Sequence, residues 1–266
     1  MAEFCSIFYA ECMQSALLQR GTLAEKAYLL IRAKILKGEF PMGHPLSRRK
    51  LASDLKMSFL PISEAIQRLE NEGLVESRPR VGTRVRIPTV QDLRDRYIVR
   101  EALETQAARL FCEKASSSER REILAMADRL EAMIAQAAAD DQEREREFSI
   151  QALHVDFHMR IAECTGCAPL IDLLERNHLL IFNWFYDVSA GYRMAPQRHR
   201  QLAEVITGND PDAAALEMGR HVRSGLEEIE KGITGRFRSI LAEPRADDAE
   251  PIALWRVRRK KKRRAR

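Results

Sequence analysis

The chain has 266 residues, which is long enough for two domains with separate hydrophobic cores. It is 45% hydrophobic, 6% aromatic and 31% charged, a composition typical of a helix-rich globular protein. No segment approaches the roughly 20 apolar residues that a membrane-spanning helix needs. Acidic Glu3 and Glu11 argue against a signal peptide, so we expect a cytoplasmic protein.

The five cysteines are an odd number without the spacing of a disulfide framework, and they predict reduced thiols. The net charge is +5, but residues 256–266 alone carry nine basic groups and no acid. Residues 41–90 hold nine Lys/Arg against five acids, while much of the remainder is acidic. This asymmetry favours a DNA-facing end and a second domain with another role.

Residues 1–20 carry no strong pattern and are predicted to be an N-terminal extension. Residues 22–37 have an amphipathic helical pattern, and Gly38 follows as a helix-ending residue. This pattern predicts the first helix of a small domain. A turn rich in proline and glycine then leads to Ser47, a good N-cap for the next helix.

Two short apolar runs at helical spacing follow, separated by a tight turn. The runs are Leu51, Ala52 and Leu55, then Ile62, Ala65, Ile66 and Leu69. Ser58 can cap the second helix, and Pro61 suits its first turn, where the missing N–H costs nothing. Two short helices with a compact joint predict a helix-turn-helix, whose second helix enters a major groove.

Asn71 and Gly73 end that second helix, and a basic hairpin is predicted after them. Its strands are expected at residues 74–76 and 84–87, around the sequence Pro-Arg-Val-Gly of residues 79–82. The hairpin would be the wing of a winged helix-turn-helix domain spanning residues 21–88.

Every long segment after Pro88 has a helical pattern. Helices are predicted at residues 91–114, 118–138, 143–164, 169–189, 196–207 and 211–231. They predict an all-helical bundle over residues 89–232, whose interior is a natural place for a ligand. Residues 233–266 are expected to be a disordered basic tail, either binding phosphates non-specifically or simply solvated.

Four histidines stand at positions that can meet inside the bundle. His154 and His158 are four residues apart, so their side chains share one helix face. His199 and His221 belong to the last two predicted helices. Each alone is more often a packed or surface residue, although two imidazoles at this spacing can bind one metal ion. His44 and His178 are interpreted as surface or packing residues.

Both halves of the chain resemble one family of bacterial transcription regulators, the GntR family, in its FadR-like subfamily. The N-terminal marks are Gly38-Glu39-Phe40-Pro41, Leu46-Ser47-x-x-x-Leu51-Ala52 and Pro61-Ile62-x-Glu64-Ala65-x-x-x-Leu69-x-x-x-Gly73-Leu74-Val75. The remainder looks like that family's FCD effector domain, through Arg100-Glu101-Ala102-Leu103-Glu104, Phe157-His158, Thr165-Gly166, His199, Ala203-x-x-x-x-Gly208-Asn209-Asp210 and Met218-x-x-His221.

The resemblance implies a mainly α protein and a homodimeric, ligand-responsive regulator, most often a repressor, that binds a double-stranded DNA operator. The implied DNA-binding residues are Arg48, Arg49, Ser58, Phe59, Ser63, Gln67, Arg68, Arg80 and Arg84. The chain departs from the family two residues before and two residues after Pro61. Family members usually carry arginine there, whereas this chain has Phe59 and Ser63, so a different operator sequence is expected.

The resemblance also implies a metal site. Three ligand positions of metal-binding FCD domains match His158, His199 and His221, and His154 stands where the family has aspartate. Four histidines favour zinc or nickel over magnesium or calcium.

The implied effector is a small organic or sugar acid. Arg100 would receive its carboxylate, and Tyr97 and Asn183 would line the same space. The alternative for Arg100 is an ion pair with Glu104, one helical turn later.

Two other functions remain open from the residues alone. A helical-bundle metalloenzyme, such as a hydrolase, would use an open metal position, but no nucleophile motif or evident general base stands beside the histidines. A non-specific nucleic-acid-binding protein would work through the basic tail and would lose binding without residues 256–266.

Overall fold

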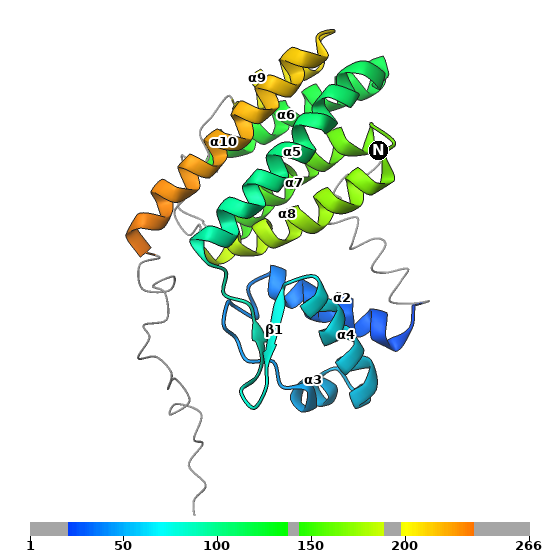
Figure 1. Cartoon of the computed structure of the whole chain (residues 1–266), viewed down its shortest axis with the longest axis vertical. Helices are drawn as coiled ribbons and strands as arrows, with labels where there is room; N and C mark the ends of the chain where they lie inside the picture. Colours follow the sequence, from blue (N-terminus) through cyan, green and yellow to red (C-terminus); the bar gives the residue numbers. More distant parts are fainter. Residues whose placement is uncertain (1–20, 138–143, 189–197, 237–266) are drawn as a thin grey trace, which may run out of the picture.

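The computed structural model describes residues 21–137, 144–188 and 198–236, and only the backbone of residues 144–147, 179–188 and 231–236. The predicted extension at residues 1–20 and most of the predicted tail lie outside the described residues. Two bodies of unequal size are packed together, a small N-terminal domain and a larger layer of long helices (Figure 1). No helix in the described ranges is long and apolar enough to cross a membrane.

The N-terminal domain contains three helices and a hairpin, as predicted. They are α2 (Leu23–Leu36), α3 (Arg48–Asp54), α4 (Phe59–Asn71), β1 (Val75–Arg78) and β2 (Gly82–Val85). Thr22 and Glu25 form a reciprocal capping box that starts α2. Ile31 and Ile35 of α2 pack with Ile62, Ile66 and Leu69 of α4 in a fully buried core.

The helix-turn-helix joint is short because α3 stops at a left-handed residue. Lys56 has a φ of +52°, and the Met57 N–H donates to the Ala52 carbonyl at 2.9 Å. Ser58 is the N-cap of α4 as predicted, but its side chain makes no capping hydrogen bond with the described residues. The prediction was therefore right about the start of α4 and wrong about the capping interaction.

The wing differs in register from the predicted hairpin. The strands pair antiparallel with Val75 opposite Val85 and Arg78 opposite Gly82, which leaves a three-residue tip at residues 79–81. Both strands lie nearer the tip than the predicted strands, which were placed at residues 74–76 and 84–87. At the tip, Arg80 adopts a φ of +63°, and this left-handed residue closes the turn.

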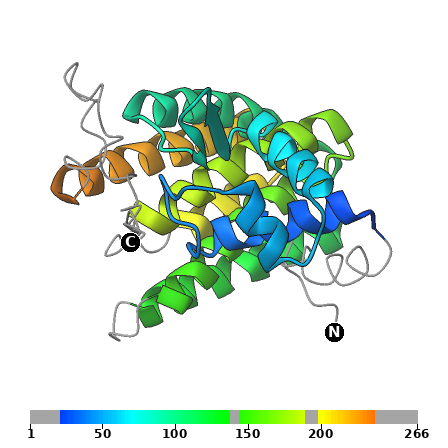
Figure 2. The ribbon, with the colours of Figure 1, turned by 90° about the horizontal axis from the view of Figure 1, so that it is seen from below.

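The second domain consists of six helices that match the six predicted ones. They are α5 (Val90–Lys114), α6 (Ser117–Ala137), α7 (Arg144–Glu163), α8 (Ala168–Val188), α9 (Arg198–Ile206) and α10 (Pro211–Arg236). α5 lies along α10 and also packs on α7 and α8, while α6 covers α7 and α9 (Figures 1 and 2). α10 continues five residues past its predicted end, because the helix runs through Gly232 without stopping.

The junction between the two domains is very short. Thr89 caps α5 through Asp92, and Asp92 also pairs with Arg86 of the wing at 2.6 Å. α2 touches α8 on the other side of the junction. A single helix, α5, therefore begins at the wing and continues through the centre of the bundle.

Candidate functional site

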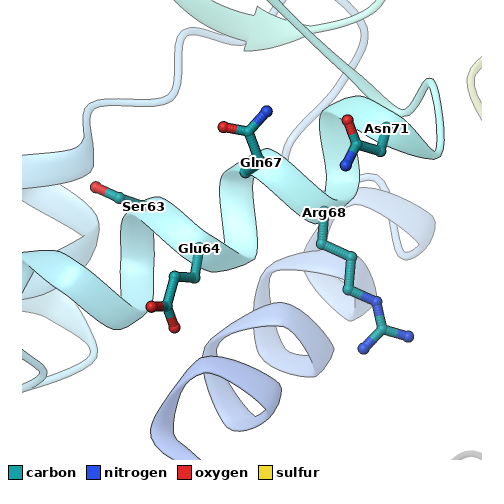
Figure 3. Close-up of a pocket in the computed structure, with 5 residues that line it drawn as sticks. All are labelled: Ser63, Glu64, Gln67, Arg68 and Asn71. Carbon is teal, nitrogen blue, oxygen red and sulfur yellow. The ribbon is translucent and has the colours of Figure 1, made fainter.

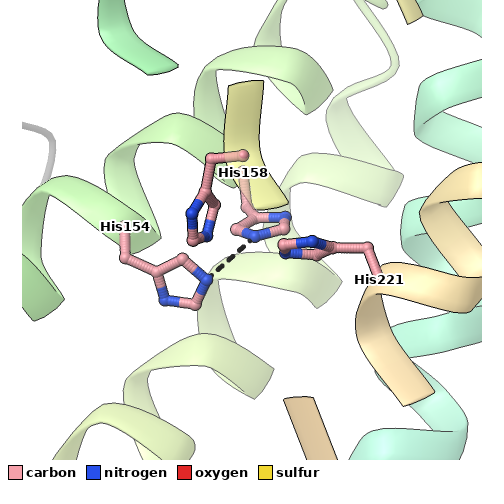
Figure 4. Close-up of side chains that lie close together, drawn as sticks. His154, His158 and His221 are labelled. Atoms are coloured by element: carbon pink, nitrogen blue, oxygen red, sulfur yellow. Dashed lines mark hydrogen bonds between the residues drawn. The ribbon is translucent and has the colours of Figure 1, made fainter. Parts of the chain in front are cut away.

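The four predicted metal-ligand histidines come together between α7, α9 and α10. His154 and His158 lie on one face of α7 and His221 lies in the middle of α10 (Figure 4). His199 lies near the start of α9. One potential ligand atom from each of the four lies within 4.8 Å of all the others. Residues separated by up to 67 positions in the sequence thus form one cluster, which we call the histidine cluster.

The ring of His158 is held between a cluster partner and a carboxylate. Its Nε2 atom lies 3.0 Å from Nε2 of His154, and its Nδ1 atom lies 2.6 Å from Oε2 of Glu104 on α5. A carboxylate on one ring nitrogen fixes the tautomer and directs the other nitrogen to a metal ion. This arrangement is the one found around ligating histidines.

His199 is oriented in the same way from another side. Oε1 of Glu131 accepts the His199 backbone N–H at 2.9 Å and lies 3.2 Å from Nδ1 of the ring. The Nε2 atom of His199 is buried and has no hydrogen-bond partner among the described residues. Because buried ring nitrogens are normally satisfied, this atom is one that could bind a metal ion.

The electrostatic surroundings keep three residues of the histidine cluster, His154, His158 and His221, neutral. Burial lowers the pKa of His158 to about 3 and the pKa of His154 and His221 well below the usual value, and the neighbouring imidazoles lower the last two further. Neutral imidazoles have a free lone pair at physiological pH, which is the form that binds a transition metal.

A buried ion pair lies directly behind the histidine cluster. Nε of Arg100 is 2.5 Å from Oε1 of Glu104, and Nη1 of Arg100 is 3.3 Å from the Tyr97 hydroxyl. The ion pair that the sequence offered as one role for Arg100 is therefore present. Burial would raise the pKa of Glu104, but Arg100 and His158 together hold it well below its usual range.

His178 also belongs to this buried group, which corrects part of its sequence interpretation. It is 2% exposed, so it is not a surface residue, and its Nε2 atom lies 3.0 Å from Oε1 of Glu104. Glu104 thus lies at polar-contact distance from Arg100, His158 and His178. His44 instead stacks on Phe40 in the N-terminal domain. The side chain of Asn183, a predicted effector contact, lies outside the described residues.

Three of the predicted DNA-binding arginines make contacts within the fold. Arg48 donates to the Thr83 hydroxyl at 3.0 Å, and Arg84 pairs with Glu76 across the wing. The Arg68 guanidinium stacks 3.8 Å from the centre of the Tyr28 ring. Arg49 and Arg80 are exposed.

The outer side of α4 is polar after its first turn. Ser63, Glu64, Gln67, Arg68 and Asn71 line a shallow hollow of about 390 Å³ (Figure 3). The Gln67 amide extends to one side of the helix and the Arg68 guanidinium to the other. The Oγ atom of Ser63 is buried and makes no hydrogen bond with the described residues, whereas Gln67 is exposed.

Comparison with known proteins agrees with this architecture. Residues 23–85 match the family model "Bacterial regulatory proteins, gntR family", and residues 95–224 match the model of the FCD domain. The chain is 28% identical over 211 residues to the "Probable D-xylose utilization operon transcriptional repressor" of Paenarthrobacter nicotinovorans, covering 79% of this chain and 89% of that one.

Two solved structures share the fold. E. coli McbR/YncC superposes with a TM-score of 0.62 at 16% identity, covering 79% of this chain and 98% of that one. A GntR transcriptional regulator from Rhodococcus sp. RHA1 gives a TM-score of 0.58 at 23% identity, covering 81% and 99%. The matched family and relatives are transcription regulators rather than enzymes.

Proposed function

This chain is a transcription regulator of the gntR family with an FCD domain, and from that premise we propose that it is a homodimeric repressor whose operator binding is modulated by a small carboxylate. The carboxylate would bind beside a divalent transition metal ion in the histidine cluster. The protein would act in the cytoplasm, on double-stranded DNA.

The observation that carries this proposal is the convergence of four imidazoles, one of which, His199, has an Nε2 atom without a hydrogen-bond partner among the described residues. Such a donor set suits zinc or nickel better than magnesium or calcium. His154, His158, His199 and His221 would hold the ion, and Glu104 and Glu131 would orient two of them. When bound, the ion would supply a Lewis-acidic site for a carboxylate oxygen.

The buried Arg100 supports a carboxylate as the ligand. Its guanidinium already binds one carboxylate, that of Glu104, so the local geometry suits this group. An incoming organic or sugar acid would compete with Glu104 for Arg100 and thereby act on α5. A D-xylose operon is named for one relative, which makes sugar-derived acids the first compounds to test.

A two-fold dimer is proposed because α4 alone is short. A 13-residue recognition helix contacts only a few base pairs, and two copies in a dimer read two half-sites. Arg49 and Arg80 are exposed on α3 and at the wing tip, the two elements that pack against α4, where they can contact phosphates.

The test is operator binding by the purified protein, measured by fluorescence anisotropy on a duplex selected from random DNA. Zinc or nickel is added alone and with acetate, malate, citrate or D-xylonate. We expect at least a tenfold change in Kd for one acid in the presence of metal. The response should disappear in the His158→Ala, His199→Ala variant.

Arg200→Ala is the matched control, since Arg200 is on the surface of α9 next to His199 and pairs with Asp128 and Glu204. It should keep the response. Equal operator affinity under all conditions, with the metal demonstrably bound, would contradict regulation by a carboxylate.

A further inference from the structure

The first turn of α4 presents two large apolar side chains to solvent. Phe59 is 55% exposed and Leu60 is 66% exposed, whereas the apolar residues of the following turns, Ile62, Ile66 and Leu69, are fully buried. An isolated exposed apolar residue needs no explanation. Two adjacent ones at the start of a recognition helix do, because the first residues of such a helix contact base edges.

The spacing along α4 places Phe59 on the same face as Gln67. Residues 59, 63 and 67 follow one another at intervals of four, so they form a row along the helix. Ser63 in the middle of this row has a buried Oγ atom. Phe59 and Leu60 at the start of α4, the Gln67 amide two turns later and Asn71 at the end are therefore the groups available on this side for contact with bases. The exposed Glu64 carboxylate extends instead to the Arg68 side of the helix (Figure 3).

No guanidinium is available on this face of α4. Arg68 is the only arginine in the helix, and α4 contains no lysine. The Arg68 side chain lies on the Tyr28 ring, donates to Glu72 at 3.3 Å and extends away from Gln67 (Figure 3). The commonest specific contact in the major groove, arginine or lysine bound to O6 and N7 of guanine, is thus absent from α4.

The remaining side chains have chemistry suited to A·T pairs. Apolar groups contact the C5-methyl group of thymine, and glutamine binds N6 and N7 of adenine through two hydrogen bonds. Exposed cationic side chains lie on the two elements that pack against α4, namely Arg49 and Lys50 on α3 and Arg80 at the tip of the wing. These positive charges complement DNA phosphates, so a DNA groove is the partner that the surface fits.

We propose that α4 reads A·T pairs, with Phe59 and Leu60 packed on thymine methyl groups and Gln67 bound to an adenine. The inference rests on the proposed operator binding and specifies the sequence class of the operator. Phosphate contacts come from α3 and the wing and carry no sequence information. The central positions of each half-site are A·T pairs, and thymine is recognised by its methyl group.

The test begins with selection of double-stranded DNA from random duplexes by the full-length protein, followed by sequencing. Half-sites enriched in thymine and adenine are expected at the positions that α4 covers. Each enriched thymine is then replaced by deoxyuridine, which differs only in lacking the methyl group. Loss of one buried methyl contact predicts roughly fourfold weaker binding.

Two variants assign the effect to α4. At one of the replaced thymines, Phe59→Ala should bind the thymine duplex and the deoxyuridine duplex with equal affinity. Leu216→Ala should preserve the wild-type ratio of the two affinities, because the exposed Leu216 lies on α10. Phe59→Arg should instead select guanine at the Phe59 position. Since Phe59 is exposed, these substitutions should leave the fold intact.

The outcomes separate this inference from the function on which it rests. A specific operator that contains fixed G·C pairs under α4, or that binds equally well with deoxyuridine, would overturn A·T reading and leave operator binding intact. Failure to enrich any sequence would overturn both.

Discussion

The Nδ1 atom of His158 on α7 lies 2.6 Å from the Oε2 atom of Glu104 on α5. The same carboxylate contacts Arg100 through its other oxygen at 2.5 Å. His158 and Arg100 therefore contact the same carboxylate, that of Glu104. An ion bound by His158 would act through Glu104 on α5. A change at the metal site has a direct route to the helix that begins at the wing.

Removal of two cluster histidines should abolish metal binding. Protein purified without added metal is expected to contain about one zinc or nickel ion per chain, and the His158→Ala, His199→Ala variant little of either. At a free metal concentration 100 times Kd, binding should stabilise the wild-type fold by about 2.7 kcal/mol. Elemental analysis and thermal denaturation with and without a chelator measure both effects. A metal-free parent that cannot be loaded would refute the site.

Glu104→Gln should weaken the site without removing a ligand. Loss of the carboxylate that orients His158 predicts roughly 10–100-fold weaker metal binding. The uncompensated buried charge of Arg100 should also cost about 3–5 kcal/mol of folding free energy. Competition titration with a chromogenic chelator gives the affinity, and urea unfolding gives the stability.

Glu101→Gln is the control for that variant, because Glu101 lies one turn earlier on α5 and pairs with Arg223 at the surface. It should change stability by less than about 1 kcal/mol and leave metal affinity unchanged. If the two variants behave alike, Glu104 has no special role at the histidine cluster.

The salt dependence of operator binding should distinguish two arginines. Arg49 is exposed on α3, so Arg49→Ala should reduce the slope of log K against log salt by about 1. Arg68 is held by Tyr28 and Glu72, so Arg68→Ala should leave the slope unchanged. Anisotropy titrations at several salt concentrations provide the slopes, and an unchanged slope for Arg49→Ala would remove that residue from the DNA contacts.

The stability of the protein should fall at alkaline pH in part through Tyr28. Burial, together with the neighbouring Glu72 carboxylate, raises its pKa from 10 to about 12. Between these values the unfolded chain releases the Tyr28 proton while the folded chain retains it, so stability decreases as pH rises. Urea unfolding of wild type and Tyr28→Phe at pH 9 to 11.5 should show a shallower decrease for the variant.

The sequence predicted the helices of both domains because their apolar residues recur at helical spacing and their ends carry caps. Two errors have local causes. Gly232 does not end α10, since a single glycine is tolerated inside a helix. The predicted positions of the wing strands differ from the observed ones, because a short basic segment with Pro79 and Gly82 does not reveal which residues form the three-residue tip.

The residues behind the histidine cluster were harder to predict than the cluster itself. The spacing of His154 and His158 indicates a shared helix face, and the positions of His199 and His221 in the last two predicted helices suggested that all four could meet. Family resemblance then strengthened the assignment of His158, His199 and His221 to one site. Nothing near His178 in the sequence indicates its contact with Glu104, 74 residues earlier, and Glu131 likewise reaches His199 across the fold. Only tertiary packing places these carboxylates, so a single sequence cannot reveal them.

The length of α5 turns small changes in the bundle into larger ones at the DNA-binding end. Asp92, tied to Arg86 of the wing, precedes Glu104 by twelve residues, or about 18 Å along a helix. A continuous helix is a stiff lever. A tilt of roughly 10° about Glu104 would displace Asp92 by about 3 Å, close to the rise of one base pair. In a dimer, two such displacements would change the spacing of the two recognition helices, so that it would no longer match the spacing of successive major grooves.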